Sequence, residues 1–199
     1  MGPIGVLSLQ GDFREHLATF SELSIPTVRV RKPADLVGIS GLVIPGGEST
    51  VIDKLSKIYE LREPIKGLIK QGLPVFGTCA GLIMLANNLV DATESQENFG
   101  GLDVEVQRNA FGSQVDSFET TVEFKGIPEP VSAAFIRAPI VRSTGNDVEV
   151  LATLSDGTIV AVKQGNLLGS SFHPEVCGET KIHEYFVEMC KTANFSASN

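Results

Sequence analysis

Three short apolar runs, each leading into a glycine-containing turn, constrain the fold of this chain most strongly. They span residues 4–9, 42–44 and 74–76. Their apolar residues are continuous instead of alternating, which is typical of strands buried on both faces, as in a parallel sheet covered by helices. After two of the runs, apolar residues recur at helical spacing, each set on one helix face: Phe13, Leu17 and Phe20, then Leu82, Leu85 and Leu89. The first part of the chain therefore predicts repeated strand-helix units of a doubly wound α/β fold, with a helix continuing through Leu89.

After residue 90 the pattern changes, because strands then follow one another with turns instead of helices between them. Residues 148–154 and 158–162 flank a Ser-Asp-Gly turn, and Asp-Gly offers the positive φ angles that a tight hairpin needs. A Gly-Asn pair then separates the second strand from residues 167–172. This half predicts an antiparallel portion that ends in a helix. The whole pattern favours one α/β domain over residues 1–199, with a mixed, mostly parallel sheet flanked by helices.

Composition excludes several classes of protein. With 199 residues, 42% of them hydrophobic, the chain can bury one sizeable core, and it holds no apolar stretch of about 18 residues that would span a membrane. The N-terminus lacks the basic region of a secretory signal, which predicts a cytoplasmic protein. A net charge of −8 without a Lys/Arg cluster argues against a nucleic-acid partner. Three cysteines without C-x-x-C spacing argue against a disulfide framework and a zinc ribbon, so no metal is expected.

Cys79 lies in a Gly-Thr-Cys-Ala-Gly turn between an apolar run and a helical pattern. Small residues on both sides let the backbone turn sharply, as in a nucleophile elbow, and leave the thiol exposed at the end of the strand. The N-terminus of the following helix favours the thiolate and can bind a developing oxyanion. The alternative interpretation is a small buried apolar side chain, the common state of a free cysteine. Cys177 and Cys190 lack such a setting.

His173, Pro174 and Glu175 form the second segment with chemical potential. His173 ends a predicted strand, and Pro174 is expected to keep the chain extended, so that Glu175 can reach the His173 ring from the same side. A carboxylate there would fix the tautomer of the imidazole and stabilise its protonated form. Taken alone, such a segment is more often a surface turn. His16 and His183 lie in helical patterns and are expected to face solvent.

A glycine-rich loop at residues 45–50 follows the second apolar run and precedes another helix. Parallel strands present their C-terminal ends at one edge of the sheet, which predicts that this loop lies near Cys79. Its backbone N–H groups could then complete an oxyanion hole. Ser49 and Thr50 followed by Asp53 could equally cap the helix, and a phosphate-binding loop is disfavoured because no G-K-[ST] is present.

Together, the segments 77–81, 45–50 and 171–175 resemble those of class I glutamine amidotransferases. Further segments narrow the resemblance to the glutaminase subunits of pyridoxal 5′-phosphate synthase, the PdxT family: residues 5–7, 9–16, 108–112, 114–118 and 135–139. The resemblance extends along nearly the whole chain. Each segment alone is unspecific, whereas their combination is highly specific.

The resemblance implies a catalytic triad in which Cys79 is the nucleophile, His173 the general base and acid, and Glu175 the orienting carboxylate. It also implies an oxyanion hole made by the backbone N–H groups of Gly47 and Ala80. The residues that it places against the substrate glutamine are Gly47, Glu48, Ser49, Arg108, Ile136 and Arg137. For the two arginines the chemistry agrees, because a guanidinium can pair with an α-carboxylate through two hydrogen bonds, although surface salt bridges are an alternative.

The activity implied by the resemblance is hydrolysis of L-glutamine to glutamate and ammonia. The ammonia would pass to a separate synthase subunit that makes pyridoxal 5′-phosphate, so this chain itself would need no cofactor. Gln10 and its loop are candidates for coupling to that partner. Two alternatives stay open: a glutaminase that serves another synthase, for example in histidine or purine biosynthesis, and a non-catalytic regulatory or binding protein on the same scaffold.

Overall fold

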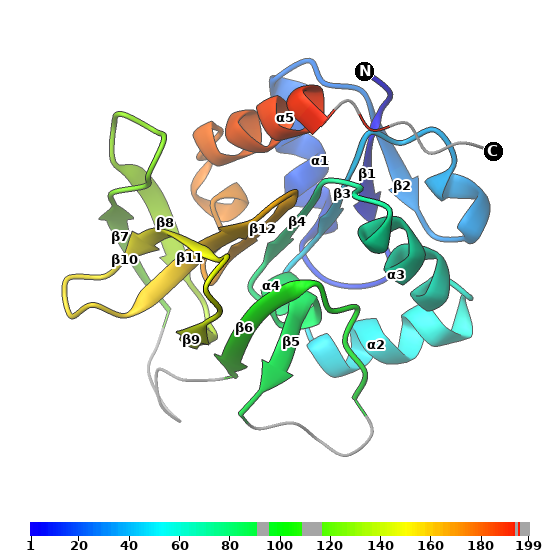
Figure 1. The fold of residues 1–199 in the computed structure, drawn as a ribbon. Coiled ribbons are helices and arrows are strands. Elements are labelled where there is room, and N and C mark those ends of the chain that lie inside the picture. The colour runs from blue at the N-terminus through cyan, green and yellow to red at the C-terminus, as the bar shows by residue number, and fades with distance from the viewer. Residues whose placement is uncertain (91–95, 109–116, 194, 196–199) are drawn as a thin grey trace.

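A mixed sheet forms the centre of the molecule (Figure 1). The computed structural model describes residues 1–90, 96–108, 117–193 and 195, and within them the sheet has ten strands. Nine follow the order β2-β1-β3-β4-β12-β11-β9-β6-β5, while β10 pairs with β11, and β7 and β8 form a separate pair. The strands are β1 (Ile4–Leu7), β2 (Thr27–Val30), β3 (Gly41–Ile44), β4 (Val75–Thr78), β5 (Ala86–Leu89), β6 (Leu102–Gln107), β7 (Phe118–Val122), β8 (Val131–Phe135), β9 (Ile140–Thr144), β10 (Glu149–Thr153), β11 (Ile159–Gln164) and β12 (Leu167–Ser170).

Helices pack on both faces of this sheet. They are α1 (Phe13–Glu22), α2 (Ser49–Ile58), α3 (Arg62–Lys70), α4 (Ala80–Leu85) and α5 (Lys181–Ala193), with 3₁₀ turns η1 (Pro33–Leu36) and η2 (Glu175–Cys177). One apolar layer contains the buried side chains of α2, α3 and α4, and the other contains those of α1 and α5. Figure 1 shows α1 beside α5, away from α2 and α3. None of the helices in the described part of the chain is long and apolar enough to cross a membrane.

Strands β1, β3 and β4 are buried on both faces, as their continuous apolar runs predict. In β3, Leu42 and Ile44 join the layer under α2 and α3, whereas Val43 joins the layer under α1 and α5. In β4, Val75 joins the layer under α2 and α3, and Phe76 joins the layer under α1 and α5. Because successive side chains of a strand point to opposite faces, a strand between two helical layers needs apolar residues at every position. The predicted fold class is confirmed.

The C-terminal part of the chain is tied to the N-terminal part through β12. It pairs antiparallel with β11, as the hairpin pattern predicts, and parallel with β4 on its other side, where Gly169 lies opposite Gly77 and Ser170 opposite Thr78. The predicted hairpin between β10 and β11 is also present. The C-terminal ends of β1, β3, β4 and β12 therefore meet at one edge of the sheet.

The helix after Cys79 is shorter than predicted. It ends at Leu85, and residues 86–89 form β5, parallel to β6, instead of a further helical turn. Asn87 and its neighbour Asn88 are exposed, and the side chain of Asn87 accepts a hydrogen bond from the backbone of Gly101 at 2.8 Å. The expectation of a helix through Leu89 is wrong because asparagine side chains compete for backbone partners, which disfavours a helix interior.

Candidate active site

Cys79 occupies the sharp turn that the sequence predicts. It lies between β4 and α4 with φ 48° and ψ −102°, a positive-φ conformation outside the left-handed helical region that a residue other than glycine rarely adopts. Its backbone N–H donates to the carbonyl of Ser170 in β12 at 2.8 Å. The glycines around it are required for close packing, because a Cβ on Gly81 would lie 2.0 Å from the Ile44 carbonyl oxygen. The turn thus fixes Cys79 against both neighbouring strands.

His173 lies next to Cys79 because of the pairing between β4 and β12. The backbone N–H of His173 also donates to the carbonyl of Ala134 in β8 at 2.8 Å, which holds the residue from the opposite side. The His173 ring is buried, and an interaction with the Cys79 side chain acts to raise the pKa of the ring. Two segments far apart in the sequence therefore form one site.

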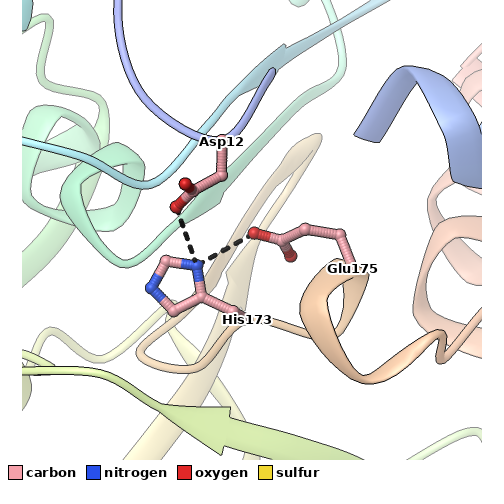
Figure 2. A group of neighbouring side chains, drawn as sticks. All are labelled: Asp12, His173 and Glu175. Atoms are coloured by element: carbon pink, nitrogen blue, oxygen red, sulfur yellow. Dashed lines mark hydrogen bonds and ion pairs between the residues drawn. The ribbon is translucent and has the colours of Figure 1, made fainter. Parts of the chain in front are cut away.

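Glu175 completes this group. The Nδ1 atom of His173 donates to Oε1 of Glu175 at 2.9 Å, which leaves Nε2 as the ring nitrogen for Cys79 (Figure 2). Burial acts to lower the pKa of His173, but the hydrogen bonds and charges of Cys79 and Glu175 outweigh it and raise the pKa to about 10. A protonated histidine is the form that can give a proton to a leaving group in nucleophilic thiol chemistry.

The route by which Glu175 reaches His173 differs from the expected one. Pro174 has φ −65° and ψ −34°, which is helical and not extended, and it begins the turn η2. The prediction of an extended His-Pro-Glu segment is wrong, because a proline also fits the first position of a short helical turn. The turn brings Glu175 back over the His173 ring and into the interior, where its side chain is buried.

The glycine-rich loop lies against the same ring, as the shared sheet edge predicts. A Cβ on Gly46 would lie 2.2 Å from Cε1 of His173. Gly47 has φ +145°, and a Cβ there would lie 2.4 Å from Oε1 of Gln10. That oxygen accepts a hydrogen bond from the backbone of Glu48 at 2.9 Å. The loop is therefore held between Gln10 and His173.

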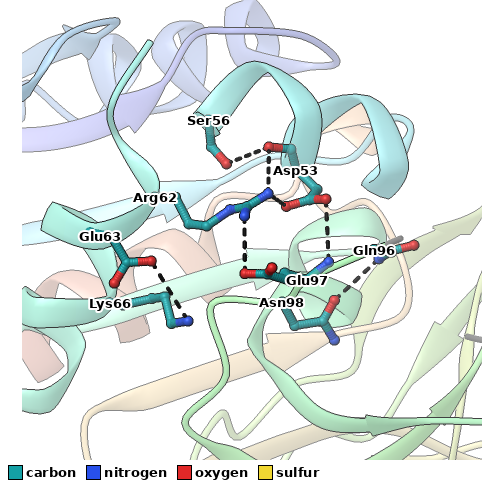
Figure 3. A network of polar contacts seen from close by, with 8 residues as sticks. All are labelled: Asp53, Ser56, Arg62, Glu63, Lys66, Gln96, Glu97 and Asn98. Carbon is teal, nitrogen blue, oxygen red and sulfur yellow. Dashed lines mark hydrogen bonds and ion pairs between the residues drawn. The ribbon is translucent and has the colours of Figure 1, made fainter. Parts of the chain in front are cut away.

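The helix-capping interpretation of this loop does not hold. Ser49 begins α2 and is buried, whereas the residue at the cap position is Glu48, whose side chain makes no capping bond. Asp53 instead pairs with Arg62 of α3, and Glu97 accepts a hydrogen bond from Arg62 at 3.0 Å (Figure 3). This network joins α2 and α3 to the segment before β6.

His16 and His183 are buried, so the expectation that they face solvent is wrong. Nδ1 of His16 and Nε2 of His183 lie 2.8 Å apart, and Nε2 of His16 lies 3.2 Å from the hydroxyl of Thr78. The ring of His183 packs edge-on against Phe20 and Phe76, with centroids 5.0 and 5.8 Å away. Because each histidine supplies a polar partner for the other, both are accommodated between α1, α5 and the sheet.

His16 also approaches the catalytic candidates from the interior. Its Nε2 lies 3.4 Å from Oε1 of Glu175. Burial, followed by the charges of His183 and His173, lowers the pKa of His16 well below its usual value, and burial lowers the pKa of His183 to about 4. Both rings are therefore neutral near pH 7. Sequence reasoning missed Asp12 as well, whose Oδ2 lies 3.5 Å from Nδ1 of His173 (Figure 2).

The residues expected to contact glutamine lie in three places. Gly47, Glu48 and Ser49 lie in the glycine-rich loop, directly after Gly46, which faces the His173 ring. Ile136 and exposed Arg137 follow β8, directly after the carbonyl that binds His173, and Arg137 has φ +46°.

Arg108 follows β6, which pairs with β9, and its Nη1 donates to the side-chain oxygen of Gln96 at 3.1 Å. The motif positions 109–112 and 114–116 lie outside the described residues.

Known proteins resemble this chain over almost its whole length. The SNO glutamine amidotransferase family matches residues 6–192. A protein of Clavibacter sepedonicus called pyridoxal 5′-phosphate synthase subunit PdxT is 56% identical over 194 residues, which cover 96% of this chain and 93% of its own length. A protein of Leifsonia xyli subsp. xyli with the same name is 56% identical over 185 residues, covering 92% of this chain and 93% of its own length.

Solved structures show the same likeness. A crystal structure of a glutamine amidotransferase is 46% identical, has a TM-score of 0.90, and covers 96% of this chain and 100% of its own. A putative GMP synthase subunit of Thermoplasma acidophilum is 18% identical and has a TM-score of 0.69. The match covers 98% of this chain and 96% of its own, and it shows a shared fold alone. The resemblance to glutamine amidotransferases of the PdxT type is confirmed, and the chain belongs to the SNO glutamine amidotransferase family of enzymes.

Proposed function

We propose that this chain hydrolyses L-glutamine through a triad of Cys79, His173 and Glu175, and that it supplies the ammonia to the synthase subunit of a pyridoxal 5′-phosphate synthase. The observation that carries the proposal is that Cys79, held against Ser170 of β12 at 2.8 Å, lies at the same sheet edge as His173, whose Nδ1 is bonded to buried Glu175 at 2.9 Å. The names of the relatives support the partner, since proteins 56% identical are called subunits of that synthase. The cytoplasm as location, and the absence of nucleic-acid and membrane partners, remain predictions.

The first half of the proposed reaction releases ammonia. The Cys79 thiolate attacks the side-chain amide carbon of glutamine, and the carbonyl oxygen becomes an oxyanion. Backbone N–H groups of Gly47 and Ala80 stabilise it; Ala80 begins α4, where the first N–H groups have no partner within the helix. Nε2 of His173 gives its proton to the departing nitrogen as the C–N bond breaks, leaving a thioester and ammonia.

The second half regenerates the enzyme. Neutral His173 accepts a proton from a water molecule, whose oxygen attacks the thioester carbon, and the C–S bond breaks to release glutamate and the Cys79 thiolate. His173 is then again protonated. Glu175 holds Nδ1 throughout, so that the same ring nitrogen faces the substrate in both halves. Arg108 or Arg137 would pair with the α-carboxylate of glutamine.

The decisive experiment measures glutamate and ammonia released from L-glutamine by the full chain, with and without the synthase subunit. We expect both products in equal amounts, with activity that requires the partner or rises strongly with it. Cys79→Ala should abolish release. Cys177→Ser is the matched control, because burial raises the pKa of this half-buried thiol and keeps it protonated. Full activity of Cys79→Ala would refute the mechanism, and stimulation by an unrelated synthase would refute the partner.

A further inference from the structure

His173 faces two carboxylates, and the mechanism above uses only one of them. Its Nδ1 lies 2.9 Å from Oε1 of Glu175 and 3.5 Å from Oδ2 of Asp12 (Figure 2). The two acids approach from different elements, since Glu175 belongs to η2 and Asp12 immediately precedes α1. The two are unequal, because the Glu175 side chain is fully buried whereas that of Asp12 is 40% exposed.

Asp12 is held in this position by its backbone. Its N–H donates to the carbonyl of Gly46 at 3.1 Å, and Gly11 adopts φ +87°, where a Cβ would lie 1.8 Å from the same carbonyl oxygen. Asp12 is also the residue at the N-terminal cap of α1, a position where aspartate normally accepts a hydrogen bond from the helix. Its side chain makes no such bond. The carboxylate is directed instead toward His173.

A negative charge on Glu175 is energetically unfavourable because the side chain is buried. Its Oε2 is buried and has no hydrogen-bond partner among the described residues. Burial raises the pKa of Glu175, against the opposing hydrogen bond and charge of His173, and the charge of Asp12 contributes to the increase. A half-exposed carboxylate such as Asp12 stays hydrated, so its charge has no comparable desolvation penalty.

We propose that Asp12 is a second carboxylate partner of His173, a positioning residue that stabilises the protonated ring at Nδ1 and partly replaces Glu175. This inference rests on the proposed function, because it concerns the same histidine. Among the described residues, the titratable groups that face His173 are Cys79 after β4, Glu175 in η2, Asp12 before α1 and, through Glu175, His16 of α1. Asp12 is the one among them that is both acidic and partly exposed.

A titration that needs no activity tests the first part of the proposal. In full-length Cys79→Ala, the His173 ring can be followed by NMR, because the protein has only two other histidines and both are buried. Asp12→Asn in this background should lower the pKa of His173 by about half to one unit, as expected for a partly solvated charge at this distance. Glu15→Gln, which removes an equal charge from the exposed side of α1, should leave it unchanged. An unchanged pKa in Asp12→Asn would overturn the proposal, whether or not the chain hydrolyses glutamine.

A double-mutant cycle tests the second part. Glutamate release is measured for Asp12→Asn, Glu175→Gln and the double variant across pH 6 to 10. We expect Asp12→Asn alone to lower kcat about three- to tenfold and to move the alkaline limb of the profile to lower pH. The double variant should lose at least threefold more activity than the product of the two single losses, because either acid partly serves when the other is absent. If the kcat loss of the double variant equalled the product of the two single losses, and the alkaline limb of the pH profile did not move, Asp12 and Glu175 would not both support His173.

Discussion

At the scale of single residues, Gly46 shows how little space surrounds the catalytic candidates. Its hypothetical Cβ would lie 2.2 Å from Cε1 and 2.9 Å from Nδ1 of His173. Gly46 has no positive φ, so alanine fits the backbone, and the conflict is mainly with the His173 ring, with Oδ2 of Asp12 next at 3.0 Å. Gly46→Ala should therefore displace His173 and lower kcat about 100-fold or more, while the free energy of unfolding falls by only about 1–3 kcal/mol.

The control for this variant is Gly67→Ala. Gly67 lies inside α3, and a Cβ there would meet nothing within 4 Å. This substitution should leave glutamate release unchanged and raise the free energy of unfolding by about 0.5–1 kcal/mol, because alanine favours a helix more than glycine does. Urea unfolding and steady-state assays on both variants provide the measurement. A Gly46→Ala enzyme with normal kcat would show that the ring is not confined as described.

The sequence predicts turns from their small residues, but it does not predict which groups surround a side chain in the fold. Small residues around Cys79 indicate a sharp turn in any context, because only they permit the close approach of α4 to β3. The burial of His16 depends on which helix face meets the sheet and on His183, which is far away in sequence. Asp12 follows the first apolar run at the same sheet edge as the glycine-rich loop, and this position was the available indication that it lies near the site.

At the scale of elements, α1 and α5 are joined by the contact between His16 and His183. Burial lowers the pKa of His183 from 6.5 to about 4 in the folded chain. Between these values only the unfolded chain binds a proton at this residue, so acid favours unfolding. The contribution of neutral His183 to the free energy of unfolding is fully present above pH 6.5. It is lost as the pH falls toward 4, by up to about 3 kcal/mol.

His183→Gln tests this pH dependence. Glutamine keeps a polar group for His16 and does not titrate, so the free energy of unfolding of the variant should fall less steeply than that of the wild type between pH 6.5 and 4.5. His16 still titrates in both proteins, which leaves part of the slope in place. The measurement is urea unfolding at several pH values. Parallel curves for the two proteins would mean that His183 is not held neutral in the folded state.

Elements with strong local patterns were predicted well. β1, β3 and β4 are buried at every position, are mostly apolar and precede glycine turns, and the hairpins of β10, β11 and β12 carry their own turn residues. β5 was missed because Leu82, Leu85 and Leu89 keep helical spacing, although Asn87 and Asn88 interrupt the helix. The parallel pairing of β12 with β4 depends on contacts between distant segments, which no local pattern contains.

At the scale of the whole molecule, Gln10 is the residue that we expect to couple the site to the proposed partner. Its side chain occupies the space beside Gly47 and accepts the backbone N–H of Glu48. We expect Gln10→Ala to reduce the ratio of glutamate release with the synthase subunit to release without it, by about threefold or more. Val37→Ala, an exposed residue on the segment after η1, should leave the ratio unchanged. If the wild type, Gln10→Ala and Val37→Ala gave the same ratio, Gln10 would have no role in the coupling.

The pairing of β4 with β12 also determines when in the synthesis of the chain the thiol acquires its base. The ribosome completes β1 to β4 and Cys79 well before it reaches β12, and until then the edge of β4 is unpaired and open to other chains. Only the arrival of β12 both covers that edge and delivers His173. On the proposed mechanism, a chain truncated before β12 is therefore expected to be inert toward glutamine, and β12 is the strand whose synthesis would confer reactivity.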